Sequence, residues 1–372
     1  MRRLRPLVGA MAITAAGFFG SLPTPTLAQS DQPAPRIIQS IQTADAPMPA
    51  DGLQAINAFN DYWVMQLASG DEAQIAKARK ELKQIVSPSG SSKEFVKQFN
   101  HNLLAKLAQV IQKPNIPSDS SADEKAQIEN NFLLTRINAM IVLVNTEGAG
   151  IEPVLAIGLN DENPGVRYWA SKAVSKIAQY KRLTKEEQAP VLKLLEQALG
   201  RETQSAALTE QLAALSNMNV GTARGILLNV LTARVGVHAK DIYASYSPEQ
   251  KALQEMFTKL IADIARNGID SDQIKSFTSV AFRYMTLATD QLLTDTAFTN
   301  ETIADKRTII RLGDRIMRFA HENIDPGARS PEKIDNALSL GDWAFIKTKV
   351  NDWNKILTKS PFNIPEDELQ TK

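Results

Sequence analysis

Apolar residues recur at helical spacing along most of the chain between residues 51 and 359. Three or four positions separate successive apolar residues, as expected when one face of a helix is buried. Clear examples are Ile75-Ala78-Leu82-Ile85, Leu253-Phe257-Leu260-Ile264 and Ile309-Leu312-Ile316-Phe319. No convincing run of alternating polar and apolar residues is followed by a hairpin turn. The pattern therefore predicts an all-α protein of about a dozen helices.

Helix starts and breaks follow from capping residues and prolines. Asn163-Pro164 and Ser330-Pro331 each place a capping side chain before a proline that can open a helix. Ser247 precedes Gln250 by three residues, the spacing of a capping box. We expect irregular breaks near 113–121, 236–246 and 323–329.

Composition and charge divide the chain into six regions. Residues 29–50 and 360–372 are polar and punctuated by proline, so we expect a linker and a flexible tail. The complete predicted organisation is a signal peptide at 1–28, a Pro-rich linker at 29–50, a helical region at 51–146, a repeat region at 147–235, a second helical region at 248–359 and the tail at 360–372.

A repeat motif stands in the middle of the chain, between Pro153 and Ile177. Asp161 and Pro164 form a tight turn, and Val166 and Arg167 open the helix that follows. This segment resembles a HEAT repeat of the armadillo-type class, and residues 190–215 resemble a degenerate second copy. The resemblance implies stacked helical pairs, as in an α-solenoid or α-α superhelix. It also implies that Asp161 and Arg167 tie neighbouring repeats together and are structural.

The N-terminal segment has the order of a secretory signal. Three arginines within the first five residues precede an apolar run, and a small-residue site ends at Ala28. We expect cleavage near Ala28 and a periplasmic or secreted protein without a membrane span; retention as an anchor is the alternative. Removing 1–28 takes away three arginines and no acidic residue, which changes the formal charge from +1 to −2.

Composition excludes several kinds of chemistry. The chain has no cysteine, so disulfides, thiolate nucleophiles and Cys-ligated metals are ruled out. Its three histidines lie at no metal-binding spacing, and its near-zero charge does not suggest nucleic acid. We accordingly expect no catalytic residue, metal or cofactor, although carboxylate pairs cannot be tested without a structure.

Two surface features are candidates for partner binding. One is a helix face with four arginines; the other is an aromatic stripe near the C-terminus that suits sugar rings or the docking of a terminal helix. Alternating charges favour a solvated face for the first, and intervening aliphatic residues favour docking for the second. The candidate partner-binding residues are Arg307, Arg311, Arg315, Arg318, Trp343 and Trp353.

The function predicted from these features is a non-catalytic scaffold or adaptor that binds a protein or a cell-envelope polymer. One alternative is an enzyme that acts on envelope polysaccharide through carboxylates in a helical cleft. The other is a module that binds a glycan or a polyanion. The sequence does not predict an oligomeric state.

Overall fold

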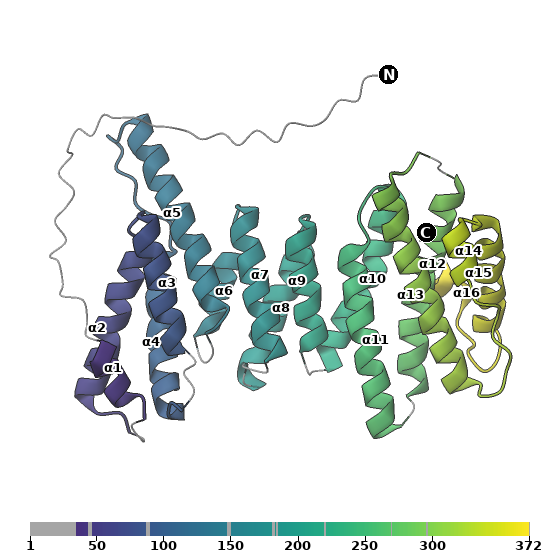
Figure 1. Ribbon diagram of the computed structural model, residues 1–372, viewed down its shortest axis with the longest axis horizontal. Coiled ribbons are helices and arrows are strands. Elements are labelled where there is room, and N and C mark those ends of the chain that lie inside the picture. The colour runs from purple at the N-terminus through teal and green to yellow at the C-terminus, as the bar shows by residue number, and fades with distance from the viewer. Residues whose placement is uncertain are drawn as a thin grey trace.

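The computed structural model describes residues 35–43, 47–86, 90–146, 150–180, 183, 185–218, 221–268, 270–294 and 297–371. This part of the chain is all-α, with sixteen helices and no strand, which confirms the predicted fold class. The helices stand side by side along the long axis, in chain order from one end to the other (Figure 1). The predicted signal peptide, 1–28, lies outside the described residues.

Twelve of the helices form two layers in which each helix packs on the next helix of its own layer. The first layer contains α2 (Ala50–Leu67), α4 (Lys93–Val110), α6 (Ile151–Leu159), α8 (Lys185–Leu199), α10 (Gly221–Lys240) and α12 (Ser271–Thr294). The second layer contains α3 (Glu72–Val86), α5 (Ala122–Leu143), α7 (Pro164–Gln179), α9 (Ser205–Asn217), α11 (Ser247–Asn267) and α13 (Asn300–Ile324). Successive hairpins therefore stack on one another, and their apolar faces form one continuous core.

Small residues allow the close approach of helices in the middle of the stack. Ala170 and Ala173 of α7 are fully buried. Gly158 of α6 lies so near that an added Cβ would come within 2.8 Å of the Ala170 Cβ and 2.5 Å of the Met140 sulfur. A side chain at residue 158 would therefore push α6 away from both α5 and α7.

Short helices close the two ends of the array. At the start, α1 (Pro35–Ile41) packs on α2 and buries Ile38. At the other end, α14 (Asp335–Leu340), α15 (Trp343–Leu357) and α16 (Glu366–Leu369) follow one another, with α15 and α16 packed against α12. The end of the array is thus covered by α15, as the docking interpretation of the aromatic stripe expects.

The two predicted flexible segments need correction. Residues 29–50 are not a linker throughout, because α1 and the buried Met48 lie within them. The prediction of a flexible tail is wrong for 360–371, where Phe362, Ile364 and Leu369 are each less than a twentieth exposed. Ser279 of α12 also donates a hydrogen bond to the Glu368 carbonyl at 2.8 Å. Proline made both segments look extended, yet their sparse apolar side chains reach the core.

One predicted helix start is also wrong, whereas two are confirmed. Asn163 caps α7 by accepting a hydrogen bond from the Gly165 amide, with Pro164 at the first helical position. Ser330 opens no helix; its hydroxyl lies 2.8 Å from Nδ1 of His321. The helix α11 does begin at Ser247, but its N-cap residue is Tyr246 and no side-chain hydrogen bond caps it, so the predicted capping box is absent. The predicted breaks at 236–246 and 323–329 are shifted, because α10 continues to Lys240 and the second break extends from 325 to 334.

Removing residues 360–372 should lower the free energy of unfolding by about 3 kcal/mol or more, because three buried apolar side chains are lost. Urea unfolding followed by circular dichroism measures the change. A matched truncation that removes only 370–372 keeps Leu369 and should be close to neutral. Equal stabilities of the two truncated chains would show that the tail does not contribute to the core.

Candidate functional site

The turn between α6 and α7 is built by the residues that carry the repeat motif. Asp161 is 7% exposed and its carboxylate accepts a hydrogen bond from the Asn163 amide at 2.8 Å. Val166, in the first turn of α7, is buried in the core. The Arg167 guanidinium donates to the carbonyls of Asp161 and Glu162 at 3.0 and 2.9 Å, which holds it across the turn.

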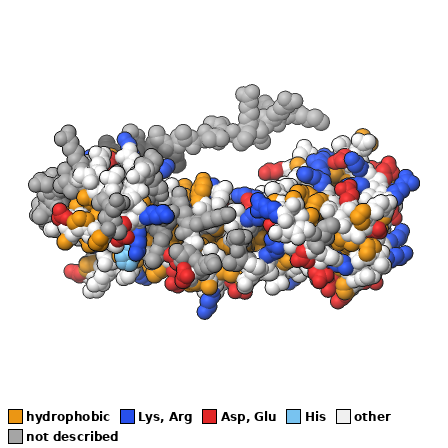
Figure 2. Space-filling model, turned by 90° about the horizontal axis from the view of Figure 1, so that it is seen from below, with side chains coloured by type: hydrophobic (Ala, Val, Ile, Leu, Met, Phe, Trp, Pro, Cys, Tyr) orange, Lys and Arg blue, Asp and Glu red, His pale blue; other side chains and the backbone are white. Residues whose placement is uncertain are grey.

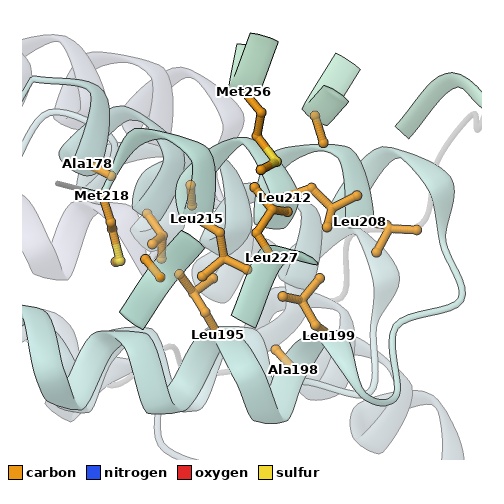
Figure 3. Packing of buried hydrophobic residues seen from close by; sticks show 14 of the residues in the cluster. Ala178, Leu195, Ala198, Leu199, Leu208, Leu212, Leu215, Met218, Leu227 and Met256 are labelled. Carbon is orange, nitrogen blue, oxygen red and sulfur yellow. The ribbon is translucent and has the colours of Figure 1, made fainter. Parts of the chain in front are cut away.

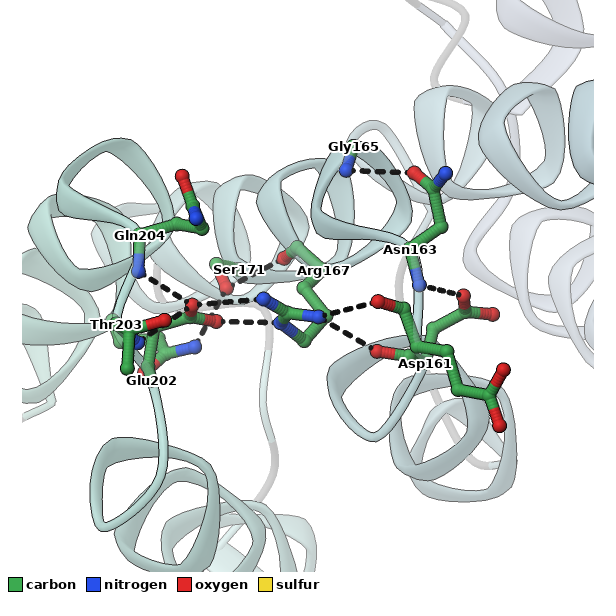
Figure 4. Close-up of polar contacts among 10 residues, drawn as sticks. Asp161, Asn163, Gly165, Arg167, Ser171, Glu202, Thr203 and Gln204 are labelled. Atoms are coloured by element: carbon green, nitrogen blue, oxygen red, sulfur yellow. Dashed lines mark hydrogen bonds and ion pairs between the residues drawn. The ribbon is translucent and has the colours of Figure 1, made fainter.

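The same arginine reaches the following hairpin (Figure 4). Arg167 donates through Nε and Nη2 to the two oxygens of Glu202, at 2.9 and 3.1 Å. Glu202 lies in the turn between α8 and α9, where it also accepts from the amides of Thr203 and Gln204. A neighbouring hydrogen bond, from Gln211 to the Ser171 hydroxyl at 3.0 Å, joins α9 to α7.

A second contact of the same kind lies one hairpin earlier. Arg136 of α5 forms an ion pair with Asp161. In both contacts an arginine of a second-layer helix binds an acidic residue in the next hairpin's turn, and that residue also accepts from turn amides. We call these two contacts the arginine rungs: Arg136–Asp161 and Arg167–Glu202. Arg136 and Glu202 were not predicted from the sequence, because their partners are distant along the chain. Arg136 lies 25 residues from Asp161, and Glu202 lies 35 residues from Arg167.

The pKa of Glu202 reflects its contact with Arg167. Burial alone disfavours a charged carboxylate, but hydrogen bonds from Arg167 and from two backbone amides outweigh burial and lower the pKa of Glu202. The same hydrogen bond raises the pKa of Arg167. The rung is thus a charged pair at neutral pH.

Glu202→Gln should lower the free energy of unfolding at pH 7 by about 3 kcal/mol, because it leaves Arg167 without its charged partner. The pKa of Glu202 is lower in the folded chain, so its contribution is fully present above the ordinary pKa of 4.5 and is lost as the pH falls through the folded value. Urea unfolding is measured from about pH 3 to about pH 7, an interval that includes the titration of carboxylates. The free energy of unfolding should depend less on pH in the variant than in the wild type.

Glu162→Gln is the matched control, because it removes an exposed carboxylate in the α6–α7 turn, whose main chain Arg167 also contacts. It should change the stability by less than about 0.5 kcal/mol. A Glu202→Gln chain as stable as the wild type at pH 7 would contradict a structural role for this rung.

The structure does not bring the four candidate arginines together into one anion site. Each has its own contact: Arg307 lies over the Trp343 ring, Arg311 is 3.3 Å from Asp335, Arg315 lies over Phe257, and Arg318 binds Asp314 at 2.8 Å. Basic and acidic side chains are mixed over this end of the molecule (Figure 2). The charge pattern of the sequence favoured a solvated face with ion pairs, and these contacts agree with that interpretation.

The two candidate tryptophans differ in accessibility. Trp353 is 1% exposed, and its indole N–H donates to Asp314 at 3.0 Å, so its ring has no free face for a sugar. Trp343 is half-buried at the start of α15, beneath Arg307. These residues hold α13 and α15 together. Trp353 is therefore not available to bind a partner.

An aromatic and basic stripe on α7 forms a partly exposed surface of the middle hairpins. It consists of Tyr168, Trp169, Lys172, Lys176 and Tyr180, none of them fully buried. Val166, Ala170, Ala173 and Ile177 occupy the buried face of the same helix. At 100° per residue, the stripe lies on the remaining side of α7. We call it the α7 face.

The side chains of the α7 face hold one another in place. The rings of Tyr168 and Trp169 meet edge to face at a centroid distance of 5.4 Å. The Lys172 ammonium lies 4.8 Å from the Trp169 ring centre and 3.3 Å from the Tyr168 hydroxyl. Lys176 lies 5.9 Å from the centre of the Tyr180 ring, and Tyr180 is 59% exposed. The sequence showed the Tyr168-Trp169 pair but not which helix face carries it.

Two cavities lie elsewhere in the stack of hairpins. The larger, about 840 Å³, lies between α5 and the α6–α7 turn, and Glu129, Asp161 and Glu162 are among its lining residues. The smaller, about 460 Å³, lies between α9, α10, α11 and α12, and we call it the wedge pocket. No cluster of three or more potential metal ligands occurs within the described ranges.

No family model matches the chain, and a search of curated proteins finds no match. Among the helices of the described residues, none combines the length and the apolarity needed to cross a membrane.

Proposed function

We propose that the protein is a non-catalytic helical-repeat adaptor that binds a protein partner through the α7 face. The observation that carries this proposal is the ordered group of aromatic and lysine side chains on the exposed side of α7. Tyrosine and tryptophan are enriched where proteins bind one another, and a few such anchors supply most of the binding energy.

Pre-organisation strengthens the argument. Binding costs conformational entropy when flexible side chains become fixed, and this cost falls when they are ordered beforehand. Lys172 is already held between two rings and a hydroxyl, and α7 itself is held on both sides by the arginine rungs. A partner would therefore meet a rigid surface. The two lysines suit a partner that offers carboxylates next to apolar side chains.

The HEAT-like assignment and the export of the protein belong to the same proposal. The first is supported by the turn of Asp161 and Pro164 and by the binding of Arg167 to the next hairpin. The second is supported by the order of basic, apolar and small residues in 1–28. Together they favour a partner in the periplasm or outside the cell.

An anionic glycan is a second candidate for the α7 face. Aromatic rings next to lysines suit sugar rings that carry carboxylates, and Trp169 with Lys172 supplies both. The alternative of a polysaccharide-acting enzyme has weaker support, because Asp161, one of the acidic residues at the larger cavity, is engaged by Arg136.

Trp169→Ala should weaken partner binding by about 30-fold, the effect of losing an aromatic anchor. The double variant Lys172→Glu, Lys176→Glu should also lose binding without removing any buried group. The measurement is affinity capture from a cell-envelope fraction, followed by titration of the captured protein against each variant. A glycan ligand would instead survive protease treatment of that fraction.

Leu340→Ala is the matched control. Leu340 is an apolar side chain that is 84% exposed and lies in α14, far along the chain from α7. Its replacement should leave capture unchanged. Capture of the same protein, with equal affinity, by all of these variants would refute the α7 face as the binding surface.

A further inference from the structure

The wedge pocket lies between α10 and α11, which a buried group of charged side chains joins at one end and an exposed ion pair, Arg224–Asp263, joins at the other. A loop at 241–246 joins the two helices, and near it Glu249 is fully buried between Arg234 and His238. These two partners lower the pKa of Glu249 although burial opposes them. α10 packs on α9 and α12, whereas α11 packs on α9 and α13. Away from the loop, residues 221–228 of α10 and 256–266 of α11 face a common space. The space left between them is the wedge pocket.

The floor of the wedge pocket is apolar and comes from four helices. Leu215 and Met218 belong to the end of α9, Leu227 to α10, Met256 to α11 and Phe277 to α12. Each is less than a tenth exposed, so the pocket reaches the core of the array. Figure 3 shows Leu215, Leu227 and Met256 among leucines of α8 and α9, with Met218 to one side of them. The two flexible methionines can adjust to the shape of an apolar ligand.

The mouth of the wedge pocket is polar and carries three basic residues. Arg224 forms an ion pair with Asp263 at 2.7 Å, and both side chains are more than a third exposed. Lys259 donates to the Ser216 carbonyl at the end of α9, and Arg266 is exposed at the end of α11. Gly221, the first residue of α10, completes this side of the pocket.

We propose that the wedge pocket binds a single-chain monocarboxylic acid, with its hydrocarbon on the apolar floor and its carboxylate among the basic residues of the mouth. A mouth with three basic residues beside an apolar floor suits an anion with one apolar chain. The volume of about 460 Å³ corresponds to roughly fifteen groups of the size of water. A medium-length chain fits this volume, whereas a two-chain lipid would leave most of its hydrocarbon outside.

The test is isothermal titration calorimetry of the purified protein with octanoate, decanoate and decanol below their aggregation concentrations. Decanoate should bind with one site per chain and about tenfold more tightly than decanol, because decanol lacks the charge. Each methylene added between octanoate and decanoate should tighten binding about fourfold. Equal affinities for decanoate and decanol would overturn the proposal, as would an apolar tripeptide that binds when decanoate does not.

Substitutions at the mouth give effects of opposite sign. Arg224→Gln removes a cation and should weaken decanoate binding about tenfold. Asp263→Asn removes a carboxylate that repels the ligand and should tighten binding about fivefold. A purely structural role of this exposed pair would make both variants bind alike. Two variants that weaken binding equally would overturn the assignment of the carboxylate to the mouth.

A matched pair of glycine substitutions tests the position of the site. An added Cβ at Gly221 or at Gly236 meets no atom within 4 Å, so a larger side chain can be placed at either residue of α10. Gly221→Phe should abolish decanoate binding, whereas Gly236→Phe, about 22 Å further along the helix, should not change it. Binding by both variants would overturn the location. The proposal does not depend on the α7 face, because decanoate binding needs no protein partner.

Discussion

Stacking between successive hairpins is the constraint on which the rest of the structure depends. One helical pair cannot bury its own apolar surface, so each needs a neighbour on either side. In this protein α7 packs at once on α5, α6 and α9, and the approach is close because Gly158 and Ala170 carry so little side chain. Apolar contacts are not directional, so this packing alone would allow one hairpin to slide along the next. The arginine rungs fix the position of each hairpin relative to its neighbour.

The rungs also explain why α7 presents a rigid outer face. Arg136 holds the turn before α7 to the preceding hairpin, and Arg167 holds α7 to the following one. With its position fixed on both sides, the helix can expose tyrosine, tryptophan and lysine side chains that keep one arrangement. The wedge pocket reflects the opposite situation, since α10 and α11 are joined by the buried Glu249 at one end but only by the exposed Arg224–Asp263 pair at the other.

Local rules of sequence predicted the helices and the α6–α7 turn well. Apolar spacing identified the buried faces of α3, α11 and α13, and the pairing of Asn163 with Pro164 located the start of α7. These features depend on residues within one or two turns of each other. The burial of Phe362 and Leu369 could not be predicted in this way, because a Pro-rich segment looks extended whether or not its apolar residues find a core.

The candidate sites were harder to predict because they depend on contacts between distant residues. Arg307, Arg311, Arg315 and Arg318 lie on one helix, but whether they bind a ligand depends on Trp343, Asp335, Phe257 and Asp314 around them. The pairing of Arg167 with Glu202 joins two hairpins. The wedge pocket is a space between four helices, and it could not be predicted because it depends on how these helices pack in three dimensions.

Site-specific photo-crosslinking tests the central claim, the binding of a partner by the α7 face, most directly. A benzophenone amino acid is placed at Tyr180, at the end of that face, or at Tyr243 in the α10–α11 loop; both side chains are 59% exposed. Illumination in intact cells should give a discrete crosslinked product with a protein partner from residue 180 and not from residue 243. The same product from both positions, or only from residue 243, would contradict the account.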